Sequence, residues 1–450
     1  METIKDFSHK KVLVIGLGIS GFAVAKLLKK LGAEVIVNEQ NMLADDAEEL
    51  KILQELGISY IGGGHNEEIL VGVDVVVKNP GIPYYTDFIQ KIIAQNIPII
   101  TEPEVAMSVC KAKVIALTAT NGKTTTTMLV YEMLNNFFSE VYFAGNIGVA
   151  FSDVVQKASE DAYIVLELSS FQLKGMPTFK PDVAMILNID EAHLDYHLDN
   201  SDYTAAKMAI FKNMTYQELL ITNADDDVLN EIIEKYPPLA ERAYFSLNKV
   251  IKGSYIKDKA LYYNKQKVCL ISDIVVPGAH NIQNVLAAIT AVKRFAVSDE
   301  AIIAALKIFT GVEHRLEYVK TLETRRIYND SKSTNVKAAQ TALSAFQQPI
   351  VWIAGGLDRG NDISGLRPFC ENVKTIVAFG QSQHKFEELA NQMRISVAKA
   401  DDLEEATKIA YDFSEAEDII LLSPACASWD QFKSFEQRGK LFKEYVEALK

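Results

Sequence analysis

Residues 114–130 read VIALTATNGKTTTTMLV, and this stretch decides how the rest of the chain is interpreted. It contains the Gly-Lys-Thr of a phosphate-binding loop, but Leu117 stands where the pattern G-x-x-x-x-G-K-[ST] requires its first glycine. The apolar run before the loop predicts a strand, and a helix is predicted to begin directly after it. Lys123 can reach phosphate oxygens at such a helix N-terminus, and the Thr124 hydroxyl can bind Mg²⁺. We therefore predict a nucleotide site, the alternative being a solvated lysine at the start of a helix.

The composition is typical of a folded protein with more than one domain. Of its 450 residues, 48% are hydrophobic and 23% are charged, so two or three domains are expected. The net charge of −13 argues against a general nucleic-acid binder, because neutralising phosphates requires clustered lysine and arginine. The four cysteines are dispersed, which favours a reducing cytoplasm, and we expect neither a signal peptide nor a membrane-spanning segment.

Short β-branched runs alternate with helical segments, which predicts α/β domains built on parallel sheets covered by helices. Three such blocks follow one another, and we place them at residues 1–101, 102–311 and 312–450. The first and third are expected to be Rossmann-like, and the second to be a P-loop-type ATPase domain. The ligands of open α/β sheets bind beyond the carboxyl ends of the strands, where the polar motifs of all three blocks are found.

The predicted elements are as follows. The first block has strands at 11–15, 34–39 and 73–83 and a helix at 21–31. The second has strands at 114–120, 163–170, 183–190 and 219–226, hairpin-like alternation over 244–276 and a helix at 280–295. The third has strands at 349–356, 375–380 and 418–425.

Three further residues of the second block could serve a nucleotide and its metal. Glu167 ends a predicted strand, His193 follows the next one, and Lys207 lies in a predicted helix, SDYTAAKMAIF. Singly, each has an ordinary explanation as a solvated acid, a structural histidine or a surface lysine. Together with the loop, Thr124, Glu167 and His193 offer two oxygens and a nitrogen to Mg²⁺, which prefers oxygen ligands and keeps several waters.

The segment TATNGKT resembles the T-G-T-N-G-K-[ST] loop of the Mur ligase family, with Ala119 in place of the usual first glycine. Alanine tolerates a positive φ poorly, so the loop is expected to hold a negative φ there or to shift slightly. The resemblance implies an ATP site formed by Asn121, Gly122, Lys123, Thr124 and Thr125. It also implies that CO₂ carbamylates Lys207 and that the carbamate helps to hold a second Mg²⁺, with His193 as another ligand.

Two other motifs of the second block fit the same resemblance. Asn146, in the turn of FAGNIGVAF, would lie beside the substrate and the metal. Asn281 and Asn284, in HNIQNVLAA, would contact adenine. The alternative for Asn281 is that it caps the N-terminus of the predicted helix.

The third block resembles the family member that uses D-glutamate, through the string SPACASWDQFKSFEQRG at 423–439. Ser428 and Phe435 match the positions that hold the D-glutamate carboxylate. In the family, residues equivalent to Arg315 and Asp330 lie near the ATP ribose and phosphates, while Lys332 and Thr334 face the reacting centre. Arg359 stands where a lysine is expected, and arginine can bind a carboxylate through two parallel hydrogen bonds; the alternative for it is a solvated loop arginine.

The motif GLGISG at 16–21 follows a predicted strand, and Glu39 lies about 20 residues further on. Alone, this pattern suggests NAD, but it cradles any diphosphate. The resemblance assigns it to UDP, with Gly18, Ile19 and Ser20 near the diphosphate, Asn38 near the uridine, and Asn79 and Gly81 lining the same cleft. The alternative for Glu39 is an exposed acid at the end of a strand.

The resemblance spans essentially the whole chain and implies an ATP-dependent amide ligase that joins D-glutamate to UDP-N-acetylmuramoyl-L-alanine through an acyl phosphate. Lys123, His193, Lys207 and Lys332 would form the catalytic set, with two Mg²⁺ ions and the lysine carbamate as cofactors. We expect a cytoplasmic monomer without nucleic-acid or membrane partners. The alternatives are a sister Mur or folylpolyglutamate-type ligase, an NAD-dependent dehydrogenase, and a non-catalytic nucleotide-binding protein.

Overall fold

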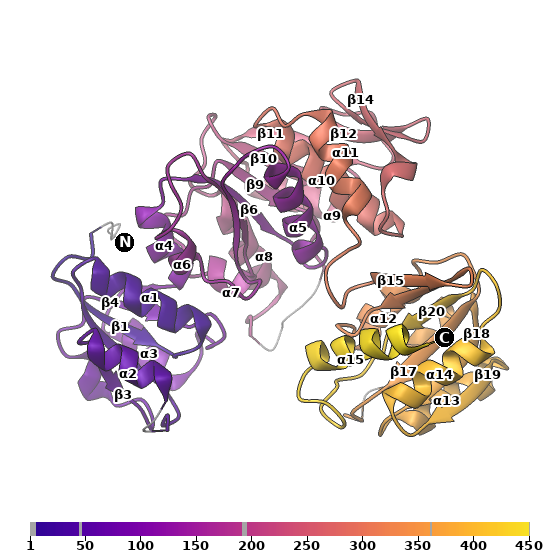
Figure 1. The fold of residues 1–450 in the computed structure, drawn as a ribbon. Helices are drawn as coiled ribbons and strands as arrows, with labels where there is room; N and C mark the ends of the chain where they lie inside the picture. The colour runs from indigo at the N-terminus through magenta and orange to yellow at the C-terminus, as the bar shows by residue number, and fades with distance from the viewer. Residues whose placement is uncertain (1–5, 45–46, 191–195, 361, 450) are drawn as a thin grey trace. The chain divides into compact units, whose positions relative to one another are not determined.

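The computed structural model describes residues 6–44, 47–190, 196–360 and 362–449. Within these residues the strands form three sheets, each covered by helices, as the alternating sequence pattern predicts (Figure 1). The first two sheets belong to one compact unit and the third sheet belongs to another. No helix in the described part of the chain is long and apolar enough to cross a membrane.

The first sheet is parallel and has the strand order β3–β2–β1–β4–β5. Its central strands are almost continuous valine, isoleucine and leucine because both of their faces are buried. The order reverses direction between β1 and β4, and the loops that follow these two strands therefore flank the crevice where ligands bind. The elements are β1 (Lys11–Ile15), α1 (Ile19–Lys30), β2 (Glu34–Asn38), α2 (Glu48–Glu55), β3 (Ser59–Ile61), β4 (Val75–Lys78), α3 (Asp87–Ala94) and β5 (Ile99–Ile100).

The second sheet has the order β14–β13–β12–β11–β10–β9–β6–β8–β7. It is parallel from β7 to β12, and β12–β13–β14 form the predicted antiparallel hairpins. The strands are β6 (Lys113–Thr118), β7 (Val141–Gly145), β8 (Tyr163–Glu167), β9 (Val183–Ile186), β10 (Leu219–Asn223), β11 (Glu241–Ser246), β12 (Gly253–Lys257), β13 (Ala260–Tyr263) and β14 (Gln266–Leu270). The helices are α4 (Glu102–Val109), α5 (Lys123–Asn135), α6 (Phe151–Val154), α7 (Ser170–Leu173), α8 (Asn200–Met208), α9 (Asp227–Lys235), α10 (Ala279–Lys293) and α11 (Asp299–Ile308).

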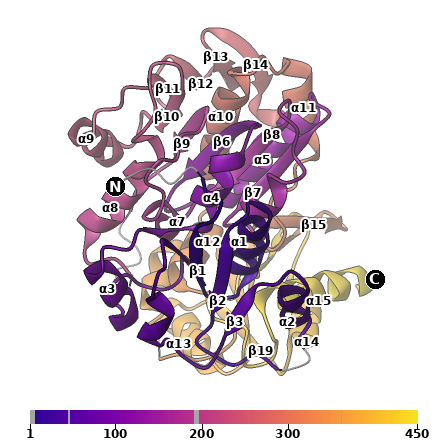
Figure 2. The same ribbon diagram turned by 90° about the vertical axis from the view of Figure 1, so that its left-hand side faces the viewer.

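The third sheet has the order β15–β16–β20–β17–β18–β19 (Figure 1), and its two edge strands, β15 and β19, are also labelled in Figure 2. In the described residues only the edge pair β15–β16 is antiparallel. Its strands are β15 (Glu317–Leu322), β16 (Arg325–Asn329), β17 (Ile350–Gly355), β18 (Val373–Phe379), β19 (Ser396–Ala400) and β20 (Ile419–Leu422). Its helices are α12 (Val336–Leu343), α13 (Gln383–Met393), α14 (Leu403–Phe413) and α15 (Phe435–Ala448).

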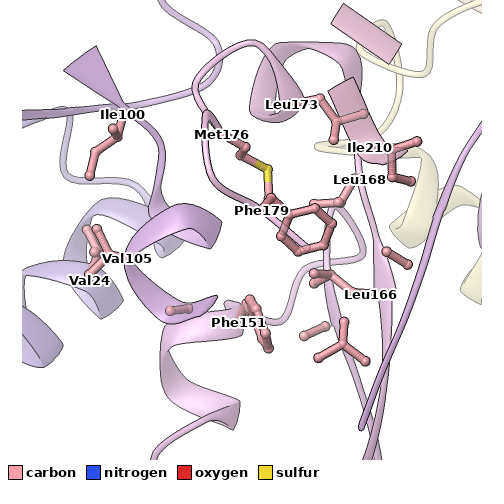
Figure 3. Packing of buried hydrophobic residues seen from close by; sticks show 14 of the residues in the cluster. Val24, Ile100, Val105, Phe151, Leu166, Leu168, Leu173, Met176, Phe179 and Ile210 are labelled. Carbon is pink, nitrogen blue, oxygen red and sulfur yellow. The ribbon is translucent and has the colours of Figure 1, made fainter. Parts of the chain in front are cut away.

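One continuous hydrophobic core joins the first two sheets. Val24 of α1, Val105 of α4, and Phe151, Leu166 and Phe179 all belong to it and are fully buried (Figure 3). Burial of each such side chain stabilises the fold by about 1.5–3 kcal/mol. The first domain is therefore packed onto the central one by ordinary core contacts in this unit.

Several predicted elements differ at their ends or were missed. The helix predicted at 21–31 is α1, which begins at Ile19 with Gly18 as the residue before its first turn, and ends at Lys30. The helix predicted at 280–295 is α10, and it begins at Ala279 and ends at Lys293. Some strands were not predicted because they lack a long β-branched run. Five of them are short or lie at a sheet edge, namely β3, β5, β7, β15 and β19, and the sixth is the interior strand β16, with the sequence RRIYN.

Candidate functional site

The loop between β6 and α5 has the shape of a phosphate cradle without a glycine at its first position. Gly122 adopts φ +83° immediately before α5, in the left-handed region that a side chain would disfavour. Ala119 does not share this conformation, since its φ is not positive. The substitution of alanine for glycine at this position therefore creates no backbone strain, and the expectation of a negative φ is confirmed.

Hydrogen bonds hold this loop against the segment that follows β9. The Asn121 N–H donates to the Asn188 side chain over 2.9 Å, and the Asn188 amide donates back to the Asn121 carbonyl over 3.0 Å. The hydroxyls of Thr120 and Tyr203 lie 2.9 Å apart. The loop is thus fixed before any ligand arrives, as a site that relies on preorganised N–H groups requires.

Two lysines meet inside the loop. Lys123, the first residue of α5, donates to the carbonyl oxygens of Ala119 and Thr120 over 2.7 and 3.1 Å. Lys207, near the end of α8, donates to the same Ala119 carbonyl over 2.8 Å and is 1% exposed. Burial, followed by the charge of Lys123, holds the pKa of Lys207 well below its usual range. A neutral amine is the form that reacts with CO₂, so this environment suits carbamylation.

Glu167 ends β8 next to the start of the loop, since it pairs in register with Leu117 of β6. The carboxylate is 1% exposed, and its Oε1 accepts from the Asn146 side chain over 3.0 Å. Its Oε2 is buried and has no hydrogen-bond partner in the described structure. A buried carboxylate oxygen without a partner is costly, and a divalent cation would satisfy it.

Of the other residues predicted to bind the cation, Thr124 can be located in the structure. Thr124 is buried in the first turn of α5. His193 lies outside the described residues. Among the described residues no cluster of three or more His, Cys, Asp or Glu side chains could hold a metal. Mg²⁺ needs no such cluster, because it is often held by one or two carboxylates, waters and substrate phosphates.

The two asparagines of α10 take different positions. Asn284 lies against the loop, since a Cβ placed on Gly122 would come within 2.5 Å of its Oδ1. Asn281 donates from its side chain to the Pro277 carbonyl over 2.6 Å. The alternative of an N-capping Asn281 is wrong, because α10 begins at Ala279 and Asn281 is already inside the helix.

The glycine loop after β1 faces the turn after β4. Gly16 has φ +91°, and a Cβ on Gly21 would come within 1.9 Å of the Gly16 carbonyl oxygen, so both positions require glycine. Asn79 packs against this loop, within 2.8 Å of where a Gly16 Cβ would stand. Gly18 and Ile19 are exposed at the start of α1, where backbone N–H groups are available to an anion.

The side chains of Glu39 and Asn38 form hydrogen bonds with backbone groups of their own domain. The Glu39 carboxylate accepts from the backbone N–H of Leu17 over 2.6 Å, so the alternative of an unengaged acid in solvent is wrong. The buried Asn38 amide donates to the carbonyls of Ile61 and Gly64, both over 2.9 Å. The contact of Asn38 with uridine stays a prediction, and it would compete with these bonds.

In the third domain, two cationic side chains each lie close to an aromatic ring. The guanidinium carbon of the exposed Arg359 lies 4.6 Å from the centre of the Trp429 ring, and Trp429 follows the buried Ser428 in the sequence. The Lys332 amine lies 5.8 Å from the centre of the ring of Phe435, the first residue of α15. Lys332 therefore lies close to Phe435, which is predicted to hold an amino-acid carboxylate, and Arg359 lies close to the residue that follows Ser428.

A buried arginine connects these two places. Arg438 of α15 is fully buried and donates to the Ser331 carbonyl over 2.8 Å and to the Cys426 carbonyl over 3.2 Å. Ser331 precedes Lys332, and Cys426 lies two residues before Ser428. Arg438 therefore holds both the loop that carries Lys332 and the loop that carries Ser428.

Asp330 is buried and engaged within its own domain. Its Oδ1 accepts from the Leu316 N–H over 3.1 Å, and its Oδ2 accepts from the hydroxyls of Ser333 and Ser423. Burial raises the pKa of Asp330 to about 6, although the neighbouring charge of Arg315 works in the opposite direction. A contact of Asp330 with ribose stays a prediction, and it would compete with these three bonds.

Comparison with known families covers the three domains in order. Residues 10–101 match the Mur ligase MurD-like N-terminal domain, 117–292 the Mur ligase middle domain, and 314–426 the Mur ligase glutamate ligase domain. The chain is 47% identical to UDP-N-acetylmuramoylalanine–D-glutamate ligase of Bacillus cereus (strain G9842) and 49% identical to that of Bacillus mycoides (strain KBAB4), with 100% of each chain covered. The chain belongs to the Mur ligase family.

Solved structures agree on the fold of this Mur ligase. UDP-N-acetylmuramate–alanine ligase of Thermotoga maritima superimposes with a TM-score of 0.59 at 19% identity, covering 98% of this chain and 100% of that one. The MurF ligase of Thermotoga maritima, solved with ADP, gives a TM-score of 0.57 at 16% identity, covering 99% of this chain and 97% of that one. The predicted α/β fold of three domains is confirmed.

Sequence reasoning missed four residues of this Mur ligase that contact the predicted site residues or the loops that carry them. Tyr203, Asn188, Trp429 and Arg438 brace or cover the predicted site residues, yet none was singled out. Arg438 and Trp429 stand inside the quoted string 423–439, so the string was found but the roles of these two residues were not. Only the burial of the Arg438 guanidinium reveals that it is a support for two loops.

Proposed function

We propose that this Mur ligase is an ATP-dependent enzyme that joins D-glutamate to UDP-N-acetylmuramoyl-L-alanine, a step of peptidoglycan precursor synthesis. The observation that carries the proposal is identity of 47–49% over the whole chain to relatives of that name. The geometry of the nucleotide loop supports an active enzyme rather than a non-catalytic relative, because Lys123, Glu167 and Lys207 lie together around one strand end.

The reaction must overcome the poor reactivity of a carboxylate. A carboxylate oxygen of the alanyl group attacks the γ-phosphorus of ATP, the bond between that phosphorus and the β–γ bridging oxygen breaks, and ADP leaves. The amine of D-glutamate then attacks the carbonyl carbon of the acyl phosphate. The tetrahedral intermediate expels phosphate, and the nitrogen loses a proton as the amide forms.

Residues of the central domain would bind ATP and offset its charge. The N–H groups and side chains of Asn121, Gly122, Lys123, Thr124 and Thr125 cradle the phosphates, and Asn281 and Asn284 contact adenine. Thr124 and Glu167, with His193 and carbamylated Lys207, would hold two Mg²⁺ ions, which when bound stabilise charge on the transferred phosphoryl group. Lys123 would leave its carbonyl partners and move to the phosphates, and Lys332 would stabilise charge at the reacting centre.

The two other substrates would bind to the outer domains. The loop 16–21, with the turn that carries Asn79 and Gly81, would bind the UDP diphosphate, and Asn146 would lie near the growing peptide. Ser428, Phe435, Arg359 and Thr334 would hold D-glutamate, and Arg315 and Asp330 would contact the ribose and phosphates of ATP. This division corresponds to domains at 1–101, 102–311 and 312–450 in a monomer acting in the cytoplasm.

The test is phosphate release from ATP in the presence of UDP-N-acetylmuramoyl-L-alanine and D-glutamate, with L-glutamate and no amino acid as controls. We expect release that requires both the UDP substrate and D-glutamate, together with an amide product of the matching mass. Release with another amino acid or a folate, and none with D-glutamate, would instead support a sister ligase. If folded protein releases no phosphate with D-glutamate, with another amino acid or with a folate, the proposal is contradicted.

A further inference from the structure

A buried lysine that no motif explains lies at the end of β4. The Lys78 side chain is 1% exposed, and its Nζ donates to the Ile82 carbonyl over 2.6 Å and to the Asn79 carbonyl over 3.0 Å. The Pro80 carbonyl lies 3.4 Å away. The turn 79–82 therefore wraps its carbonyl oxygens around a single amine, which acts as the centre of the turn.

The fourth oxygen around Lys78 comes from the central domain. The Tyr196 hydroxyl lies 3.1 Å from Lys78 Nζ and also donates to the Ile82 carbonyl over 3.3 Å. The rings of Tyr84 and Tyr196 stand 4.7 and 5.6 Å from the same amine. One lysine thus fastens the turn after β4 to a segment of the neighbouring domain.

The charged groups around this site do not neutralise Lys78. Among the described residues no carboxylate lies within 4.0 Å of its Nζ, and Asp202 pairs instead with Lys174 and His197. Burial, followed by the charge of Lys174, lowers the pKa of Lys78 to about 7. A buried amine without a counter-charge opposes folding. The charge of Lys78 therefore does not stabilise the fold, and the contribution of this side chain lies in its hydrogen bonds to the turn.

The opposite side of the same turn faces the glycine loop. The Asn79 side chain accepts from the Gly81 N–H over 3.0 Å and packs against Gly16, with its amide 3.5 Å from where a Gly18 Cβ would stand. Lys78 and Asn79 are consecutive at the end of β4, where successive side chains point to opposite faces. The position of the amine therefore sets the position of Asn79 relative to loop 16–21.

We propose that Lys78 is a positioning residue for the UDP-linked substrate, which holds the carbonyl oxygens of turn 79–82 so that Asn79 and Gly81 face loop 16–21. The inference rests on the proposed function, in which this cleft binds the UDP diphosphate. Through Tyr196 the same amine joins the substrate cleft to the central domain. Lys78 does not touch the reacting atoms and acts through the turn.

The variant Lys78→Met tests this, because it keeps an unbranched side chain only one heavy atom shorter and removes every hydrogen bond from that side chain to the turn. We expect the KM for UDP-N-acetylmuramoyl-L-alanine to rise about tenfold or more, since several hydrogen bonds that fix the turn are lost. The KM for ATP and for D-glutamate, and kcat, should stay within about threefold, because the chemistry is untouched. Lys91→Met is the matched control, since Lys91 is a surface lysine of the same domain that pairs with Glu67.

A direct binding measurement distinguishes failure of the proposed function from failure of the inference about Lys78. Calorimetric titration of UDP-N-acetylmuramoyl-L-alanine without ATP should give a Kd that rises in Lys78→Met and not in Lys91→Met. If the wild type neither binds nor turns over this substrate, the proposed function fails. If the wild type does both and folded Lys78→Met keeps its Kd and KM, the inference about Lys78 fails.

A milder variant covers the case in which Lys78→Met does not fold. Tyr196→Phe removes the hydroxyl that accepts a hydrogen bond from Lys78, and it changes neither Lys78 nor the residues of the turn. We expect it to raise the Kd for the UDP substrate about threefold or more, with ATP binding unchanged, because the lost hydroxyl makes two hydrogen bonds and each contributes about 0.5–1.5 kcal/mol. An unchanged Kd for the UDP substrate in this variant would overturn the proposal.

Discussion

The side-chain amines of Lys123 and Lys207 both donate to one oxygen, the carbonyl of Ala119, over 2.7 and 2.8 Å. Two cationic groups at one acceptor repel each other, and this repulsion adds to burial in lowering the pKa of Lys207. Conversion of Lys207 to a carbamate would replace the repulsion with attraction. Lys123 would also be freed from part of its competition for the Ala119 carbonyl, and could then move toward the phosphates.

Replacement of Lys123 by alanine should abolish most catalysis and leave the fold intact. A preorganised charge at a developing phosphoryl group contributes about 3–4 kcal/mol, so kcat/KM should fall by about 10²–10³-fold or more. The check is steady-state phosphate release, with circular dichroism to confirm folding. Lys157→Ala, which alters an exposed lysine of the same domain, should behave as the wild type. Near-normal turnover in Lys123→Ala would remove this lysine from the mechanism.

Replacement of Lys207 by alanine should also abolish activity, but an added carboxylate should partly restore it. The alanine variant leaves a buried space beside the Ala119 carbonyl, where acetate or another short carboxylate can stand in for the carbamate. The measurement is phosphate release against acetate concentration, with Lys123→Ala as the control that acetate does not rescue. An absence of rescue would count against the carbamate, but it would not contradict the proposal that the wild-type protein is a ligase.

The architecture was predictable because its signal is local. Buried parallel strands such as β1, β6 and β17 are continuous apolar runs, and a turn and a helix follow each of them. Edge strands such as β5, with two residues, and β19, which is partly exposed, have no such signature. Their pairing depends on the neighbouring strand rather than on their own sequence, so they were missed.

The candidate site was predictable where a motif places a residue at a strand end, as for Lys123 and Glu167. It was not predictable where burial decides the role. Lys78 and Arg438 look like surface charges in the sequence, and only the fold encloses them among carbonyl oxygens. Glu39 likewise reads as a strand-end acid, but tertiary structure brings Leu17 to it and makes it a support of the glycine loop.

The carboxylate of Glu102 should make stability depend on pH. Glu102 begins α4 and is buried, and its Oε1 accepts from the Ser152 N–H over 2.5 Å. Burial raises its pKa from 4.5 to about 7, against the effect of the hydrogen bond from Ser152. The folded state therefore binds more protons than the unfolded state between these two values, and stability is lost as pH rises through this window.

Glu102→Gln removes this dependence because the amide keeps an acceptor for the Ser152 N–H and carries no charge. The variant and the wild type should differ least at about pH 4.5, and at about pH 8 the variant should be more stable by about 3 kcal/mol. Thermal unfolding midpoints at several pH values measure the difference. Glu160→Gln, at an exposed position of the same domain, is the control. A gap between wild type and Glu102→Gln that does not widen with pH would contradict the assignment.

Arg359 should determine the affinity for the amino acid. Its guanidinium carbon lies 4.6 Å from the centre of the Trp429 ring, Trp429 follows Ser428 in the sequence, and a guanidinium can bind a carboxylate through two parallel hydrogen bonds. Since hydrogen bonds to a charged group contribute about 1.5–3 kcal/mol, Arg359→Ala should raise the KM for D-glutamate about 10- to 100-fold and leave the KM for ATP unchanged. Arg359→Lys should recover part of the loss through charge alone. Arg367→Ala, at an exposed arginine of the same domain, should have no effect on either KM. Equal increases in the KM for D-glutamate and for ATP in Arg359→Ala would indicate a general disturbance of the domain, and an unchanged KM for D-glutamate would show that Arg359 is a solvated loop residue.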